Sequence, residues 1–316
     1  MKKLAGFYRG VDLGGWFSQC DYSKDVLDNF ITEKDFEVIE GWGLDHVRLP
    51  IDYNILETED GGYREDGFDR VKKAVDTAIA HHLNIVIDLH KTAGFSFDNG
   101  EAEAGFFENK AYRERFKALW EQIARRFAGY EGHVAFELLN EVTDQSYIDV
   151  WNECARECIA GIRRYTGSIP VLVGSYWNNS AETVRFLDPP ADENVFYNFH
   201  CYSPLKFTHQ GATWTDQIDP AERFSFDEYG ITEEYFDGIF KSALEKAEKE
   251  NTGLYCGEYG VIDRVSPEDT LKWYTVINRV FEKYGIGRAA WNYRQKDFGL
   301  SDERMKPVID ELVKVL

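Results

Sequence analysis

The sequence predicts an α/β protein, a single (β/α)8 TIM barrel with a long loop after its sixth strand. Eight short apolar segments with strand character recur along the 316 residues, and helical periodicity fills most of the intervals between them. No linker or low-complexity stretch interrupts the series. Strands that alternate with helices form parallel sheets, and eight repeats in a chain of this length favour a closed barrel. We therefore expect one domain over residues 1–316.

The strand predictions rest on short apolar runs that are bounded by turn residues. The first strand starts near Phe7 and ends in a glycine-rich turn before Trp16, which does not match the glycine pattern of a dinucleotide-binding loop. The other expected strands cover residues 45–51, 84–90, 134–139, 169–173, 194–199, 254–258 and 287–293.

Helices are expected where apolar residues recur every three or four positions. Thr32 and Asp35 form a capping-box pattern at the start of the first helix, and Gly41 and Gly43 end it. Further helices are expected over residues 68–82, 111–127, 146–164, 233–249 and 267–284, and from residue 304 onward. A long polar loop is expected over residues 91–108. Residues 205–232 lack strong periodicity, and so long an irregular segment is usually a functional loop or lid.

Composition excludes some partners and leaves localisation open. The net charge of −20 argues against nucleic acid and anionic membranes, because both are polyanions. No apolar run reaches the length of a membrane span. No signal peptide is visible, so the protein is secreted if one was removed and cytoplasmic otherwise. We expect a monomer.

The five cysteines are odd in number and have no Cys-x-x-Cys spacing, so reduced thiols are expected. Cys154 and Cys158 lie four positions apart on an expected helix, where a buried face is a better explanation than a metal site. We expect no metal and no cofactor.

Polar and aromatic side chains follow the expected strands. In a barrel the carboxyl ends of all strands open onto one face, where active sites are built. The residues at these ends are Trp16, Arg48, His90, Asn140, Glu141, Trp177, His200, Tyr202, Glu258 and Trp291. Glu141 and Glu258 could face each other across one mouth, as glycosidic hydrolysis requires. A Gly-x-Ser-x-Gly elbow, a His-x-x-x-His pair and a strand-end lysine are all absent from the sequence.

Each of these residues also has a structural explanation. Glu141, Glu258 and Arg48 could be partners in structural ion pairs. His90 and His200 could be histidines at the edge of the core that bond to the backbone. The tryptophans could be packing residues rather than platforms for sugar rings.

Motifs along nearly the whole chain resemble those of glycoside hydrolase family 5, the cellulase family A. They are the segments 12–16, 46–50, 88–90, 136–141, 198–202, 257–260 and 290–293. The Leu-Asn-Glu sequence that ends at Glu141, followed later by Gly-Glu-Tyr-Gly around Glu258, is specific to the family. Residues 207–214 resemble a loop found in a branch with clostridial and rumen-type endoglucanases.

The resemblance implies that Glu141 is the general acid/base and Glu258 the nucleophile of a retaining mechanism. The supporting residues that it implies are Arg48, Asn140, His200 and Tyr202. The side chains expected to bind substrate are Trp16, His90, Trp177, His209, Trp214 and Trp291; for His209 a purely structural role in the loop is an equal alternative.

We therefore expect a retaining endo-β-1,4-glucanase (cellulase) that acts on a β-glucan or related polysaccharide or oligosaccharide. The alternatives are a β-mannanase, a glucomannanase, or a mixed-linkage or β-1,3-glucanase with the same catalytic pair. Two further alternatives come from other classes of protein: a non-catalytic glycan-binding barrel and a metal-dependent hydrolase. Loss of turnover in Glu258→Gln would exclude the first, and full activity in EDTA would exclude the second.

Overall fold

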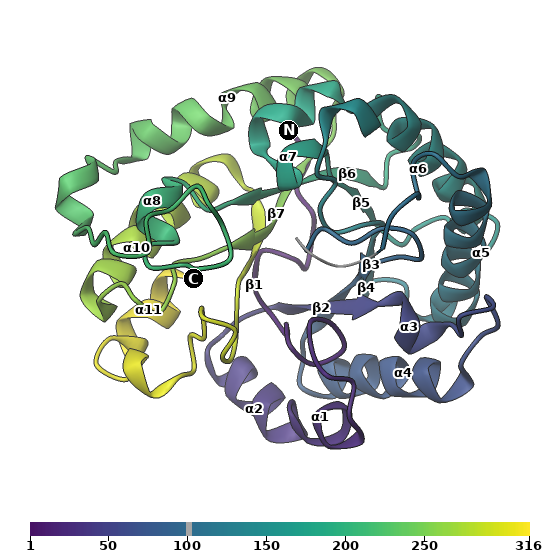
Figure 1. The fold of residues 1–316 in the computed structure, drawn as a ribbon, viewed down its shortest axis with the longest axis horizontal. Helices are drawn as coiled ribbons and strands as arrows, with labels where there is room; N and C mark the ends of the chain where they lie inside the picture. Colours follow the sequence, from purple (N-terminus) through teal and green to yellow (C-terminus); the bar gives the residue numbers. More distant parts are fainter. Residues whose placement is uncertain (99–102) are drawn as a thin grey trace.

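The computed structural model describes residues 1–98 and 103–316, and its eight parallel strands close into a barrel (Figure 1). Each strand pairs with the next, and Val11 pairs with both Val47 and Ala290, which closes the ring between the last strand and the first. The strands are β1 (Arg9–Asp12), β2 (His46–Asp52), β3 (Asn84–Lys91), β4 (Val134–Glu137), β5 (Val171–Val173), β6 (Val195–Cys201), β7 (Leu254–Tyr259) and β8 (Gly287–Ala290). The predicted fold class is confirmed.

Helices surround the barrel (Figure 1). They are α1 (Lys24–Asn29), α2 (Glu33–Gly41), α3 (Tyr53–Leu56), α4 (Glu65–Ala80), α5 (Lys110–Phe127), α6 (Ile148–Ile162), α7 (Tyr176–Asn179), α8 (Leu205–Thr208), α9 (Glu233–Lys249), α10 (Pro267–Tyr284) and α11 (Ile309–Val315). The predicted bounds of α9 and α10 are correct, and the predicted capping box at Thr32 is present.

Other helix boundaries differ from the prediction: α4 covers Glu65–Ala80 rather than residues 68–82, for example. The last helix begins at Ile309 rather than residue 304, because residues 303–305 form a separate 3-10 turn. A 3-10 turn also precedes α6, which begins at Ile148. The short helix α1 was not predicted, because it buries none of its residues and so has no apolar periodicity.

Two different layers fill the barrel. The lower layer is apolar and takes one residue from each of six strands, with two N-terminal residues beneath them: Leu4, Phe7, Val86, Ala135, Leu172, Phe196, Tyr255 and Ala289. The upper layer is charged, because Arg48 of β2, Asp88 of β3 and Glu137 of β4 are completely buried. This charged layer lies directly beneath the strand ends that were predicted to carry the chemistry.

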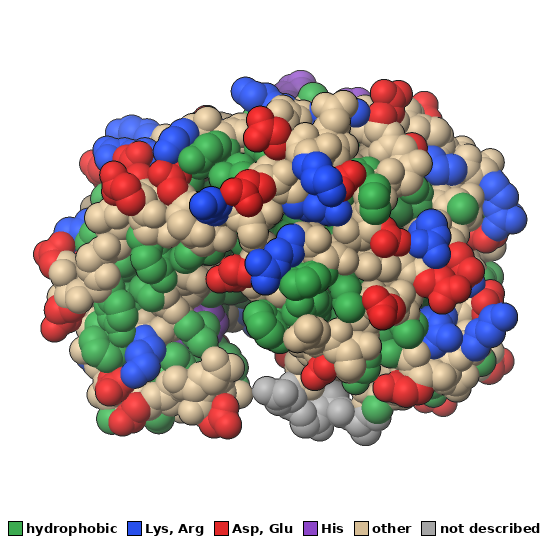
Figure 2. Space-filling model, turned by 90° about the horizontal axis from the view of Figure 1, so that it is seen from above, with side chains coloured by type: hydrophobic (Ala, Val, Ile, Leu, Met, Phe, Trp, Pro, Cys, Tyr) green, Lys and Arg blue, Asp and Glu red, His purple; other side chains and the backbone are tan. Residues whose placement is uncertain are grey.

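Both predicted loops are present. The segment 91–108 connects β3 to α5, although residues 99–102 of it lie outside the described part of the chain. The segment 205–232 contains only α8 and a 3-10 turn at Phe226–Tyr229. The surface in Figure 2 carries scattered charges of both signs and is hollowed at its lower edge, where hydrophobic and histidine side chains are visible. Among the described residues, no helix combines the length and apolarity needed to cross a bilayer.

Candidate active site

A bulge in β7 aims Glu258 into the mouth of the barrel. In the pairing of β6 with β7, Phe199 lies opposite Cys256 but His200 lies opposite Glu258, so Gly257 is the extra residue. A bulge bends its strand and turns the next side chain to a new direction. A Cβ on Gly257 would lie 3.1 Å from Nε2 of His200, so glycine allows this close approach.

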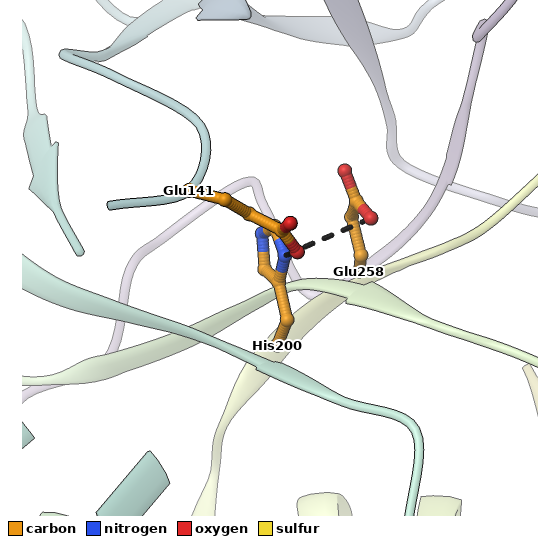
Figure 3. A group of neighbouring side chains, drawn as sticks. All are labelled: Glu141, His200 and Glu258. Carbon is orange, nitrogen blue, oxygen red and sulfur yellow. Dashed lines mark hydrogen bonds and ion pairs between the residues drawn. The ribbon is translucent and has the colours of Figure 1, made fainter. Parts of the chain in front are cut away.

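Glu141, His200 and Glu258 converge from three strand ends (Figure 3). Nδ1 of His200 lies 2.8 Å from Oε1 of Glu141 and 3.6 Å from Oε2 of Glu258. One ligating atom from each of the three residues lies within 4.8 Å of the others. A retaining glycosidase needs its carboxyl groups about 5–5.5 Å apart, whereas an inverting enzyme needs about 6.5–9.5 Å. The observed approach fits the shorter spacing.

Burial favours the protonated form of Glu141, which can donate a proton. Loss of solvent raises its pKa to about 7, although Asn178 and Arg48 favour the charged form. Burial also lowers the pKa of His200 to about 4, so this imidazole is neutral near pH 7. A neutral imidazole with its proton on Nδ1 can donate to the Glu141 carboxylate. Glu141 is therefore protonated over part of the neutral range.

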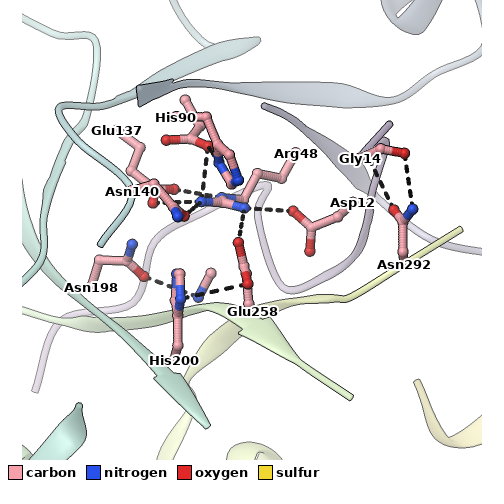
Figure 4. A network of polar contacts seen from close by, with 12 residues as sticks. Asp12, Gly14, Arg48, His90, Glu137, Asn140, Asn198, His200, Glu258 and Asn292 are labelled. Atoms are coloured by element: carbon pink, nitrogen blue, oxygen red, sulfur yellow. Dashed lines mark hydrogen bonds and ion pairs between the residues drawn. The ribbon is translucent and has the colours of Figure 1, made fainter. Parts of the chain in front are cut away.

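Arg48 organises the charged layer (Figure 4). Its Nη1 donates to Glu258 Oε1 and to Asp12 Oδ1, both at 2.9 Å, and its Nε donates to Glu137 Oε2 at 2.7 Å. Its Nη2 also lies 3.0 Å from Asp88 Oδ2. The hydroxyl of Tyr202 donates to the second oxygen of Glu258 at 2.8 Å. Glu258 thus accepts a hydrogen bond at each of its two oxygens.

Asn140 and His90 line the same mouth. Oδ1 of Asn140 accepts from Arg48 Nη2 at 2.7 Å, while its buried Nδ2 has no hydrogen-bond partner among the described residues. A buried amide N–H without a partner suits a donor for substrate. Nδ1 of His90 forms a hydrogen bond of 2.6 Å with Oδ2 of Asp88. The His90 ring is stacked on Trp291, with 5.8 Å between the ring centroids.

The other predicted substrate-binding residues lie in different settings. Trp16 is buried, donates its indole N–H to Leu27 and stacks on Phe17, so it packs within the core. Trp177 and Trp214 are exposed, at 57% and 47%. His209 is half-buried with its ring edge-on to Tyr202, and loss of solvent lowers its pKa to about 4. The expected roles of all four in binding substrate stay predictions.

Four residues of the site had no predicted role. Asp12, Asp88 and Glu137 surround Arg48, and their position as acidic residues within otherwise apolar strands could have marked them. Asn178 donates from Nδ2 to Glu141 Oε2 at 2.9 Å. Its contact depends on a turn after β5, and nothing in the sequence pattern indicates it.

The (β/α)8 barrel has two carboxyl groups at one mouth, one with a pKa raised by burial and one that accepts hydrogen bonds at both oxygens. This arrangement defines a glycoside hydrolase of the two-carboxylate class. The model of the family Cellulase (glycosyl hydrolase family 5) matches residues 11–297. The chain belongs to glycosyl hydrolase family 5.

Characterised relatives support this assignment. The chain is 57% identical to Cellodextrinase A of Ruminococcus flavefaciens, over 91% of this chain and 86% of that protein. It is 35% identical to Endoglucanase C of Acetivibrio thermocellus, over 99% and 98% of the two chains. A crystal structure of a hyperthermophilic endo-β-1,4-glucanase in complex with substrate superposes with a TM-score of 0.83 at 26% identity, over 98% and 96% of the two chains. The protein is a glycoside hydrolase.

Proposed function

We propose that this enzyme is a retaining endo-β-1,4-glucanase in which Glu258 is the nucleophile and Glu141 the general acid/base. The approach of these two carboxyl groups to within 4.8 Å is the observation that carries the proposal. The different environments of the two groups agree with the two roles, since burial keeps Glu141 acidic while Arg48 and Tyr202 stabilise a charge on Glu258.

In the first half of the reaction, Glu258 attacks the anomeric carbon and forms an ester with the sugar. The glycosidic C–O bond breaks, and the proton of Glu141 passes to the departing oxygen. The Nδ2 of Asn140, which has no hydrogen-bond partner among the described residues, would donate to the sugar 2-hydroxyl, a contact that strengthens in the oxocarbenium-like transition state.

In the second half, Glu141 is ionised and acts as a base. It takes a proton from a water molecule, whose oxygen attacks the anomeric carbon and releases Glu258. The two displacements each invert the anomeric centre, so its configuration is retained. The free enzyme is restored with Glu141 protonated and Glu258 ionised.

Two substrate preferences compete within this mechanism. Similarity to an endoglucanase over both full chains favours internal cleavage of β-1,4-glucan. The higher identity to a protein named cellodextrinase favours short soluble cello-oligosaccharides. Both require the same bond cleavage, so the choice depends on the length of chain that the cleft accepts.

Viscosity loss measured against reducing ends released separates these preferences. We expect wild-type enzyme to lower the viscosity of carboxymethyl-cellulose with few new reducing ends, and Glu258→Gln to lose at least about 1,000-fold in kcat because no nucleophile remains. Cellotetraose turnover in the same preparations tests the cellodextrin preference. Activity confined to glucomannan would instead assign the mannan alternative.

A folded Glu258→Gln that keeps wild-type activity would contradict the assignment of the nucleophile. Rapid hydrolysis of cellotetraose with little loss of polymer viscosity would leave the mechanism intact and make the enzyme a cellodextrinase.

A further inference from the structure

The turn after β5 has an unusual backbone. Trp177, Asn178 and Asn179 have φ values of 52°, 51° and 62°, so three consecutive residues other than glycine are left-handed. Asparagine tolerates this conformation better than most residues, whereas a bulky side chain such as tryptophan does so at a cost. Such a turn persists only where its surroundings hold it, and these conformations concentrate at functional sites.

Hydrogen bonds tie this turn to the segment that follows Glu141. The backbone N–H of Asn178 donates to the carbonyl of Val142 at 3.0 Å, and that of Trp177 donates to the carbonyl of Thr143 at 3.3 Å. The turn and the chain that carries Glu141 are therefore fixed relative to each other.

The Asn178 side chain turns from this exposed position toward the buried carboxyl group. Its bond from Nδ2 to Glu141 Oε2 is the one side-chain hydrogen bond recorded for it within residues 1–98 and 103–316. His200 contacts the other oxygen, Oε1, from the barrel side. Glu141 thus has a hydrogen-bond partner at each of its two oxygens, which fixes the plane of its carboxyl group.

We infer that Asn178 is a positioning residue that orients the Glu141 carboxyl group and stabilises its ionised form. This inference rests on the proposed acid/base role of Glu141. An amide N–H favours a carboxylate over the neutral acid, so it opposes the effect of burial. Without the amide, the pKa of Glu141 would lie higher and the carboxyl group could rotate away from the departing oxygen.

Asn178→Gly tests the role of the amide while it preserves the turn, because glycine adopts left-handed φ without strain. Asn251→Gly is the matched control: Asn251 is exposed, has a φ of 51°, and precedes β7 at the opposite end of the barrel. We would measure kcat/KM against pH on cellotetraose and on 2,4-dinitrophenyl β-cellobioside, whose leaving group departs without a proton.

In Asn178→Gly we expect the basic limb of the cellotetraose profile to move up by about one pH unit, the effect of one hydrogen bond to a charged group. Misorientation of the acid lowers kcat/KM on cellotetraose about tenfold, while kcat/KM on the dinitrophenyl substrate stays within about twofold. Asn251→Gly retains the wild-type profile on both substrates.

An unmoved basic limb, or equal losses on the two substrates, would overturn the inference. Glu141→Gln separates this result from a failure of the proposed function. If Glu141→Gln hydrolyses cellotetraose at the wild-type rate, Glu141 is not the acid and the proposed function itself fails. If Glu141→Gln is inactive and Asn178→Gly is silent, only the role of Asn178 fails.

Discussion

Arg48 shares one guanidinium among four carboxylates, those of Asp12, Asp88, Glu137 and Glu258. The planar fork offers five N–H donors in fixed directions, which a lysine could not reproduce. Burial raises the pKa of Asp12 and Asp88 well above their ordinary values, despite the opposing effect of Arg48. Burial therefore opposes the ionisation of these two groups, which share the Arg48 guanidinium with Glu258.

The raised pKa that keeps Glu141 protonated near pH 7 lowers the stability of the folded protein. This pKa is about 7 in the folded protein and 4.5 ordinarily, so the folded state binds more protons between these pH values. The free energy of unfolding therefore falls as pH rises from 4.5 to 7 and stays lower above 7. We expect Glu141→Gln to raise the free energy of unfolding by about 1–3 kcal/mol at pH 8 and to leave it unchanged at pH 4. Urea denaturation at both pH values measures this.

Glu153→Gln serves as the control for that measurement, since Glu153 lies exposed on α6 and should show no pH-dependent gain. An equal gain for Glu141→Gln at both pH values would mean that its charge is not the cause.

Among single residues, the sequence predicted the place of those site residues that follow the end of a strand. Glu141, His200 and Glu258 each follow an apolar run, so a barrel brings them together whatever its details. Asn178 could not be found in this way, because the preference of asparagine for a left-handed turn does not specify which group its side chain reaches.

Among the elements, the β7 bulge controls the direction of Glu258. A Cβ on Gly257 would come within 2.9–3.1 Å of the Asn198 and His200 side chains, and one of the two must move to admit it. We expect Gly257→Ala to lower kcat/KM about 10- to 100-fold and to destabilise the fold by about 1–3 kcal/mol. Steady-state kinetics on cellotetraose and urea denaturation give the two values.

Gly238→Ala is the matched control for this substitution. Gly238 lies within α9, and a Cβ there would meet no atom within 4 Å. Because alanine favours a helix, this variant should be as stable as wild type or slightly more stable, with unchanged kinetics. Wild-type kinetics in Gly257→Ala would show that the bulge does not determine the direction of the Glu258 side chain.

Helix ends were predictable where capping residues specify them. Thr232 begins α9 through its side chain, and Ser266 with Pro267 begins α10, so both sets of bounds agreed with the prediction. The interval between β5 and β6 holds only α7 and a 3-10 helix at Ala181–Phe186. Such short turns lack the apolar repeat on which sequence-based assignment depends.

For the whole molecule, closure of the barrel explains why the fold and the composition of the mouth were predictable together. Alternating strands and helices specify parallel pairing, and parallel closure places all carboxyl ends on one face. Distances within the mouth were not predictable, because they depend on bulges and on the charged layer around Arg48. The approach of Glu141 and Glu258 to within 4.8 Å, which favours a mechanism that retains the anomeric configuration, was seen only in the structure.

The last prediction concerns the whole enzyme and its need for a metal ion. The proposed mechanism takes its acid and its nucleophile from the protein, so we expect full activity after dialysis against EDTA. Glu141, His200 and Glu258 are the one group of three potential ligands within reach of a single cation in the described part of the chain. A cation bound there would occupy the oxygen that attacks and the oxygen that carries the proton, so it would inhibit. We would assay carboxymethyl-cellulose hydrolysis after EDTA and again with added Zn²⁺, where activation by the metal would contradict the mechanism.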